Sequence, residues 1–264
     1  MGAAIDTITA TVTAAAAGGS AMTAAAGDSL IVRSIPPDKK AWLLNLWADV
    51  QTTLFYQLTS PRLHDNTRGL RFRTLISEVV PNLPMGVRQQ LFDQDTLALT
   101  LAGAAVAGDI ESVSLLVYYE DLKGADARFI DYDTLMKRGV EMVTVENTIT
   151  TGAGGGYTGG EAINAESDLF KGNQDYALMG YRVGVECASV CWRGADTGNL
   201  RVAGPGNELN GELTSSWFVN LSRAHGFPLI PVFNSANRAG VTIDAVQDEN
   251  AAAVPVTSIF MRLA

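Results

Sequence analysis

The chain has 264 residues, a mass of 28.0 kDa and a formal net charge of −9. Apolar residues make up 47% of it and charged residues 18%, which excludes an intrinsically disordered chain, because such chains are less apolar and more charged. The first Lys or Arg is Arg33, so we expect no secretory signal. The longest apolar stretch, near residues 97–108, is shorter than the roughly 20 residues that a membrane-spanning helix needs. The length suits one large domain or two small ones.

Residues 1–28 are mainly Ala, Gly and Thr. Residues 8–13 have the β-branched character of a strand, whereas residues 14–28 are of low complexity, so that the segment 1–28 is predicted to be an N-terminal arm. Alternating and apolar runs then predict a first set of strands. They cover residues 29–35, 41–49, 53–60, 69–77, 95–101 and 112–120.

Two short helices are predicted among these strands, at residues 85–92 and 131–138. The second begins at Asp131, ends on Lys137 and Arg138, and is followed by Gly139. This order suits an N-cap, the helix dipole and a C-terminal stop. Because this helix lies at mid-chain, we interpret residues 131–139 as a linker.

A second set of strands follows the linker. It covers residues 140–151, 175–185, 188–193, 199–203, 216–222, 239–245 and 254–263, with a glycine-rich loop at 152–160. Many short strands separated by turn-rich loops are typical of β-sandwiches and barrels.

The two sets of strands indicate an internal duplication. Trp42 and Trp47 match Tyr176 and Tyr181, in both cases 134 residues later. Residues 69–71 (Gly-Leu-Arg) resemble the segment from Gly198 to Arg201, and residues 114–116 match residues 258–260, 144 positions later. Because these matches occur in the same order, we predict two similar β units. An eight-stranded jelly roll used twice fits this length.

With these paired segments and the mid-chain helix, the chain resembles the double jelly-roll major capsid proteins of tailless icosahedral viruses. The resemblance covers about residues 29–264 and is strongest to the compact versions in membrane-containing bacteriophages of the corticovirus and finnlakevirus kind. It implies an all-β fold with a first jelly roll at 29–130 and a second at 140–264.

The resemblance also implies partners and a location. Three copies would form a trimer of pseudo-hexagonal outline, which contacts neighbouring capsomers and, in the shell, penton and minor capsid proteins. Residues 1–28 would face inward, toward a membrane or a neighbour. The protein would be made in the host cytoplasm and reside in the virion.

Direct binding of nucleic acid is not expected. Phosphate binding needs grouped Lys and Arg, and the protein is acidic. The nearest group is Arg62, Arg68, Arg71 and Arg73, which we interpret as a solvated loop and outward-facing strand positions.

No catalytic, cofactor or metal site is predicted. Cys187 and Cys191 would lie about 13 Å apart in an extended strand at ~3.3 Å per residue, which is too far for a disulfide, so we expect buried free thiols. His64 and His225 are the only histidines, too few for the usual zinc site. Ser222, His225 and Asp244 lack the nucleophile elbow of a hydrolase.

Two further motifs have plain structural interpretations. Gly154, Gly156 and Gly159 satisfy G-x-G-x-x-G, but they lack the strand–helix context of a dinucleotide site. Two Asp pairs could supply oxygen ligands for calcium, although turn and helix-capping roles explain them. These pairs are Asp93 with Asp95 and Asp131 with Asp133.

An alternative is a carbohydrate-binding tandem β-sandwich, such as a lectin or adhesion module. A stripe of aromatic residues could stack on sugar rings, although core packing is the simpler interpretation. The stripe consists of Trp42, Trp47, Phe55 and Tyr56. A cupin-like enzyme is a weaker option, because it needs a histidine-rich metal site.

Overall fold

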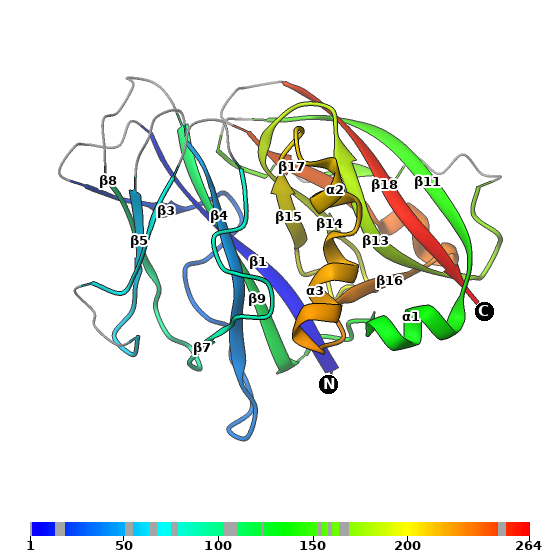
Figure 1. The fold of residues 1–264 in the computed structure, drawn as a ribbon, viewed down its shortest axis with the longest axis horizontal. Helices are drawn as coiled ribbons and strands as arrows, with labels where there is room; N and C mark the ends of the chain where they lie inside the picture. Colours follow the sequence, from blue (N-terminus) through cyan, green and yellow to red (C-terminus); the bar gives the residue numbers. More distant parts are fainter. Residues whose placement is uncertain are drawn as a thin grey trace.

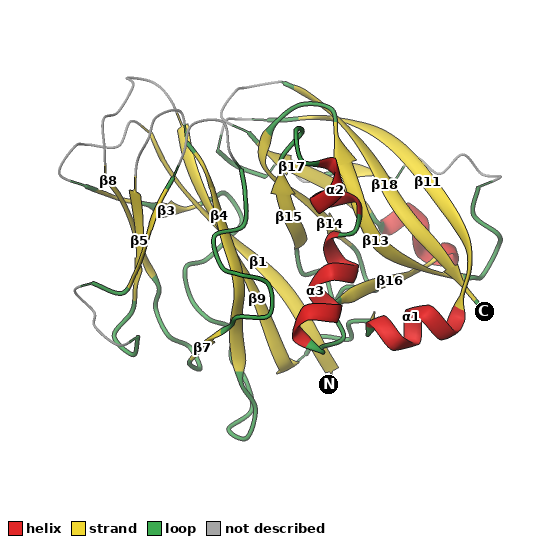
Figure 2. Cartoon of the chain, in the orientation of Figure 1, coloured by secondary structure: helices red, strands yellow, loops and turns green. Residues whose placement is uncertain are grey.

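The computed structural model describes residues 2–13, 19–50, 55–63, 68–74, 79–102, 110–122, 124–152, 155–157, 160–163, 169–247 and 252–264. Within these residues the chain forms four antiparallel sheets and a few short helices (Figures 1 and 2). The expectation of an all-β protein is therefore confirmed.

The first half contains two of the sheets. One has the strand order β3-β1-β9-β4-β7 and the other the order β2-β8-β5-β6. The bounds of these strands are β1 Gly2–Thr13, β2 Ser20–Ala21, β3 Thr23–Ala24, β4 Ala41–Asp49, β5 Phe55–Thr59, β6 Leu70–Arg73, β7 Gln89–Leu91, β8 Ala98–Ala102 and β9 Ile110–Leu122.

The second half contains the other two sheets, with the orders β10-β16-β13-β18-β11 and β12-β17-β14-β15. The bounds of these strands are β10 Phe129–Ile130, β11 Gly139–Thr150, β12 Glu161–Ala162, β13 Asp175–Val183, β14 Cys187–Arg193, β15 Val202–Gly206, β16 Ile230–Asn234, β17 Thr242–Val246 and β18 Ala253–Leu263.

The two halves share one pairing scheme, which includes an equivalent register shift in one pair of strands of each half. In the first half β4 pairs with β9, with a register shift between Leu43 and Asn45. In the second half β13 pairs with β18, with a shift between Leu178 and Gly180. When the two register shifts are aligned, Leu43 of β4 corresponds to Leu178 of β13, which is an offset of 135 positions. The predicted duplication is therefore present in the strand pairing, but one residue away from the offset of 134 that the aromatic residues suggest.

The four sheets form a stack of layers. Strands β1, β9 and β4 of the first half contact β15 and β14 of the second half, so the two inner sheets face each other (Figure 1). β1 therefore has seven consecutive buried residues, Ala4 to Ala10, which is typical of a strand covered on both faces. The outermost layers are the sheet that contains β5 and the sheet that contains β11.

The prediction that residues 1–28 form an N-terminal arm is wrong for β1. It lies inside its sheet, paired with β9 from Thr13 back to Gly2 and with β3 at Ala10 and Thr11. Its threonines and isoleucines suit this position, because β-branched side chains pack well on a pleated sheet. Residues 14–18 of the predicted arm lie outside the described residues.

The helices agree with the sequence at one place and differ at two. α1 (Tyr132–Arg138) begins at the N-cap Asp131, whose carboxylate accepts a 2.7 Å hydrogen bond from the Thr134 amide, as predicted. The predicted helix at 85–92 is wrong. There Gly86 has a φ of +86°, a conformation that interrupts a helix, and the strand β7 pairs with the edge of β4.

The predicted strand at 216–222 is also wrong, because this segment lies in α3 (Trp217–His225), which follows the short α2 (Gly211–Ser215) and the single residue Ser216. α3 buries Trp217, Phe218 and Leu221 on one face and packs on β13. A short apolar run suits a buried strand and a buried helix equally well. The predicted strand at 29–35 reduces to a single bridge between Ile31 and Thr96.

Candidate functional site: the contact between the two halves

The contact between the halves joins the two inner sheets and contains two largely buried carboxylates that pair with arginines, Asp6 with Arg33 and Asp28 with Arg201. Within the described part of the chain, no group of three or more His, Cys, Asp or Glu is arranged to hold a metal ion. None of the described helices is long and apolar enough to span a membrane.

Trp47 is the main apolar anchor of this contact. Its side chain is fully buried and extends from β4 into the second half. The indole Nε1 donates a 2.8 Å hydrogen bond to the backbone oxygen of Ala188 on β14. Its ring meets Trp217 of α3 edge to face, with centroids 5.9 Å apart. Such pairs stabilise beyond the burial of area alone.

A chain of hydroxyl groups continues the contact along β1. Thr9 shares hydrogen bonds with Ser114 on β9 (2.9 Å) and with the Tyr157 hydroxyl of the second half (3.0 Å). The Arg201 guanidinium lies over the Tyr157 ring, 4.4 Å from its centroid. The second-half residues here are small, since Ala188, Cys191 and Ala203 pack with Tyr157, which lets the two sheets approach closely.

Two carboxylates and two guanidinium groups form an ionic cluster at one end of the contact, in which both carboxylates and Arg201 are largely buried and the Arg33 side chain is half exposed. Asp6 accepts a 2.5 Å hydrogen bond from Arg33 Nε and a 3.1 Å bond from the Arg201 amide. Asp28 accepts one from the Arg201 side chain and a 2.8 Å bond from the Thr9 amide. Each buried charge is thereby paired and hydrogen-bonded, as burial of charge requires.

Burial dominates the electrostatics of this cluster. It raises the pKa of Asp6, against the opposing charge of Arg33. It also raises the pKa of Asp28 to about 6, although Arg201 and the Thr9 amide oppose the shift. The ionised forms are therefore less favourable here than in water.

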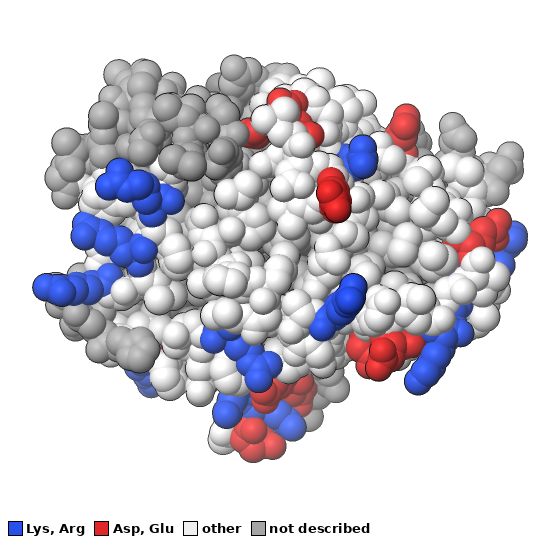
Figure 3. Space-filling model, in the orientation of Figure 1, with Lys and Arg blue, Asp and Glu red and all other residues white. Residues whose placement is uncertain are grey.

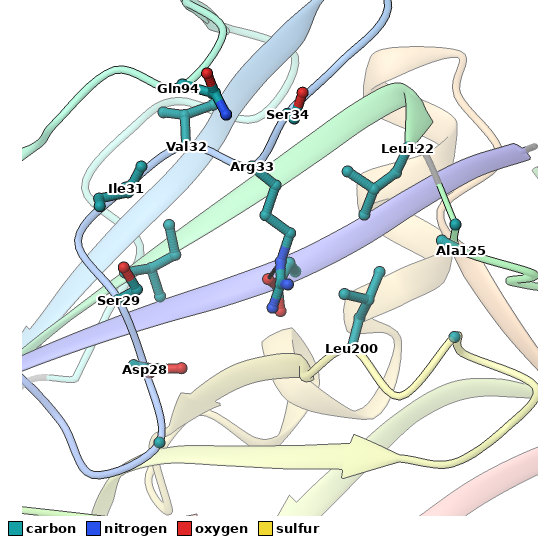
Figure 4. Close-up of a pocket in the computed structure, with 15 residues that line it drawn as sticks. Asp28, Ser29, Ile31, Val32, Arg33, Ser34, Gln94, Leu122, Ala125 and Leu200 are labelled. Carbon is teal, nitrogen blue, oxygen red and sulfur yellow. Dashed lines mark hydrogen bonds and ion pairs between the residues drawn. The ribbon is translucent and has the colours of Figure 1, made fainter.

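A cavity of about 600 Å³ lies beside the cluster. Figure 4 shows Arg33 pointing across β1 toward the segment that carries Leu200. The wall combines Asp6 and Asp28 with apolar side chains such as Ile8 and Leu122. Because both carboxylates and both guanidinium groups already have partners, this arrangement suits a structural junction between the halves.

The predicted thiols are confirmed as free and buried. Cys187 and Cys191 lie on β14 and form no disulfide. Burial raises the pKa of both thiols well above the usual range, which keeps them protonated and unreactive.

The structure does not assemble a hydrolase triad. The Ser222 hydroxyl donates to the backbone oxygen of Phe227 (2.6 Å) and accepts from the Tyr132 amide (3.0 Å). Among the described residues, neither ring nitrogen of His225 has a hydrogen-bond partner, and burial lowers the pKa of its ring to about 4. His64, Gly154 and Gly159 lie outside the described residues.

Three of the four carboxylates considered for calcium accept hydrogen bonds from other groups of the chain. Asp93 accepts a 2.8 Å hydrogen bond from the Ile35 amide, and Asp95 accepts one from the Ser60 hydroxyl. Asp131 caps α1, as described above.

The aromatic stripe does not form one exposed platform. Trp47 and Tyr56 are fully buried, as the core-packing interpretation predicts. Trp42 is partly buried and lies under the Arg88 guanidinium, whose carbon is 4.6 Å from the ring centroid. Arg71 covers Phe55 in the same way, at 3.8 Å.

Reasoning from sequence missed the ionic cluster. Its members come from β1, from the loop before β4 and from the segment before β15. Asp28 and Arg33 stand next to a low-complexity segment, and no spacing in the sequence links them to Arg201. The one available signal was a buried-strand pattern around Asp6, since a carboxylate inside such a strand needs a cationic partner.

No protein-family profile and no curated protein matches the chain. Among solved structures, it is similar to the crystal structure of the PBSX exported protein XepA, at 11% sequence identity and a TM-score of 0.26. The match covers 97% of this chain and 86% of that chain. A similarity this weak supports no inference about fold or function.

Proposed function

We propose that this protein is the major coat protein of a tailless virus, built from two jelly rolls and assembling through trimers into an icosahedral shell. The observation that carries the proposal is the repeated order of its strands. Without the short strands β3 and β10, each half has eight strands, which we letter B to I in chain order, so that β1 and β11 are B and β9 and β18 are I. Both halves then read B-I-D-G in one sheet and C-H-E-F in the other, which is the order of a jelly roll.

The way the halves are joined also supports a coat protein. Jelly rolls serve viral capsids, lectins and cupins alike, so the fold alone does not decide between these functions. Here the two units pack side by side through their sheets, with Trp47 and Arg201 as buried links. Two rigidly joined units of similar shape give a trimer six lobes, which suits a hexagonal position in a shell.

The carbohydrate-binding alternative lacks a comparable observation. Trp47 and Tyr56 are fully buried, and cations lie over the rings of Trp42 and Phe55. Contact with an underlying membrane through residues 1–28 is no longer part of the proposal, because β1 is an interior strand.

Light scattering on a sizing column, across a range of concentrations, tests the proposal. The expected result is a species of about 84 kDa, three times the 28.0 kDa chain, or particles in the megadalton range that electron microscopy shows as closed shells. A 28.0 kDa monomer at every concentration contradicts the proposal, and glycan-array screening then tests the lectin alternative.

A further inference from the structure

The outer face of β11 repeats the face that β1 buries between the halves. The pairing of β4 with β9 and of β13 with β18 matches Val117 with Phe260, so Tyr119 of β9 corresponds to Arg262 of β18. Their partners Ala4 on β1 and Glu141 on β11 therefore correspond as well. The side chains of β1 that face the second half are Ile5, Thr7, Thr9, Thr11 and Thr13, and their counterparts are Met142, Thr144, Glu146, Thr148 and Thr150. Four of the five positions keep an aliphatic residue or a threonine. The same surface is thus present twice in the chain.

Only one of these two surfaces is covered. Ile5, Thr7 and Thr9 are buried against the second half, whereas all five counterparts on β11 are exposed, with Met142 at 63% of its area. The neighbouring strand repeats the pattern, since Leu116 of β9 is fully buried and its counterpart Ile259 of β18 is only partly so. An exposed surface built like a buried one indicates a missing partner.

The opposite end of the stack carries the matching surface. In the second half, the outer face of the β14–β15–β17 sheet offers small residues, among them Ala188, Cys191 and Ala203, and the first half covers it. In the first half, the corresponding sheet, β2-β8-β5-β6, is an outermost layer. Its outer face carries Phe55, Gln57 and Thr59 on β5 and Ala98 and Thr100 on β8, so it is small and polar apart from the Phe55 ring, which lies under Arg71.

We infer that a second copy of this chain docks its β5–β6–β8 face on the exposed β11–β18 face and so repeats between molecules the contact that joins the halves. The inference rests on the proposed coat function and names the surfaces through which its trimer forms. The contact is head to tail, because two different faces meet, and head-to-tail contacts close into rings when the rotation permits. Three copies with two units each make a ring of six.

Charge complementarity selects this partner. The protein has a net charge of −9, yet Arg71 and Arg73 on β6 are exposed, and neither forms an ion pair within the described residues. Figure 3 shows Lys and Arg gathered at this end of the molecule, over β5 and β6. On the other face, the exposed Glu146 likewise forms no ion pair among the described residues.

The contact between the two halves also places arginine on one side and carboxylates on the other. There Arg201, just before β15, reaches from the second half to Asp28 and Asp6 of the first half. β15 occupies the place in its sheet that β6 occupies in the other half. In both contacts the arginines therefore come from the same edge of the unit. The facing carboxylates are Asp6 of β1 and Asp28 of the loop after β3 in the internal contact, and Glu146 of β11 on the exposed face.

Charge reversal on the two faces tests the inference. The variants are Glu146→Arg and the pair Arg71→Glu with Arg73→Glu, measured by sedimentation velocity across concentrations beside the wild-type chain. Each should weaken self-association at least tenfold, because facing like charges cost several kcal/mol. The chain that carries all three substitutions should recover to within about threefold of wild type, because its two faces are complementary again.

Two further variants control the experiment. Asp38→Arg reverses an exposed carboxylate, whose side chain is 77% exposed, in a turn away from both faces, and it should associate like wild type. Thr144→Trp blocks the β11 face by bulk and leaves the charge unchanged, so it should associate as weakly as Glu146→Arg. Far-UV circular dichroism and melting temperature establish that each variant is folded.

The outcomes separate the inference from the proposed function. If the wild-type chain assembles and Glu146→Arg, Thr144→Trp and the Arg71–Arg73 pair assemble equally well, the inference is wrong and the coat function stands. If only the combined chain fails to recover, the two faces do not meet each other and the inference is again wrong. A wild-type chain that stays monomeric overturns both.

Discussion

Trp47 and Tyr181 match in sequence, and each pairs across its sheet with a serine, but their side chains point to opposite faces. Trp47 pairs with Ser114 and Tyr181 with Ser258. The indole of Trp47 leaves its own half and bonds Ala188, whereas the hydroxyl of Tyr181 bonds Pro205 within its own half. The register shifts identify Leu46 as the counterpart of Tyr181. An error of one residue reverses every side chain of a strand.

We expect Trp47→Ala to destabilise the protein strongly. The ring is fully buried between the halves, and its removal leaves a cavity and an unpaired backbone oxygen on Ala188. A loss of about 3–5 kcal/mol in the free energy of unfolding follows, measured by urea denaturation. Trp42→Ala is the matched control, because this ring is only partly buried, and its loss should be clearly smaller. Equal losses would show that the halves are not held together through Trp47.

Substitution of Gly204 tests how closely β15 packs against Tyr181 of β13 and Trp217 of α3. A Cβ atom at this position would lie 2.1 Å from the Tyr181 hydroxyl oxygen and 2.7 Å from Nε1 of Trp217. Gly204→Ala should therefore cost about 3 kcal/mol through overpacking. Gly172→Ala is the control, since its Cβ would meet nothing within 4 Å, and a change within about 0.5 kcal/mol is expected. Thermal and urea unfolding measure both, and similar stabilities for the two variants would contradict the packing.

Asp28 should make stability depend on pH in a direction opposite to that of a typical carboxylate. Its pKa rises from 3.8 to about 6 on folding, so between these values the folded protein binds more protons than the unfolded chain. The Asp28 contribution to the free energy of unfolding therefore falls as the pH rises from 3.8 to 6 and stays low above that range. The prediction is that Asp28→Asn gains stability relative to wild type as the pH rises from 4 to 6, measured by urea denaturation at each pH.

Asp131 provides the control for this pH experiment. The hydrogen bonds from Thr134 lower the pKa of this N-cap carboxylate below 3.8. Its contribution is present above that pH and is lost as the pH falls through the lowered value. Asp131→Asn should therefore lose stability relative to wild type as the pH rises through this lower window. A stability difference between Asp28→Asn and wild type that does not change from pH 4 to 6 would contradict a raised pKa at Asp28.

The sequence predicts the positions of several elements better than it predicts which parts of the chain cover them. Strand β4 and helix α1 were found almost residue for residue, because each has strong local signals: an apolar run bounded by turns, and an N-cap with a basic last turn. The sequence predicts β1 only as part of an arm, since its alternating Ala and Thr are covered on both faces by partners far along the chain. It predicts a strand at α3, because a short apolar run does not define its period.

The junction could not be predicted for a related physical reason. Asp6 and Arg201 are brought together by the packing of two complete units, and neither residue stands in a motif. A fold of this kind places its most important polar contacts between segments that are distant in the sequence.

The places of β9 and β18 in their sheets also determine how the two units fold. β9 lies between β1 and β4, and β18 lies between β11 and β13. Both strands therefore pair with partners that are distant in the sequence, as Val145 does with Ser258. Because non-local pairing of this kind is slow, we expect the β11–β18 face to form late in folding. A folding subunit then offers no complete face to its neighbours until β18 has paired on both edges.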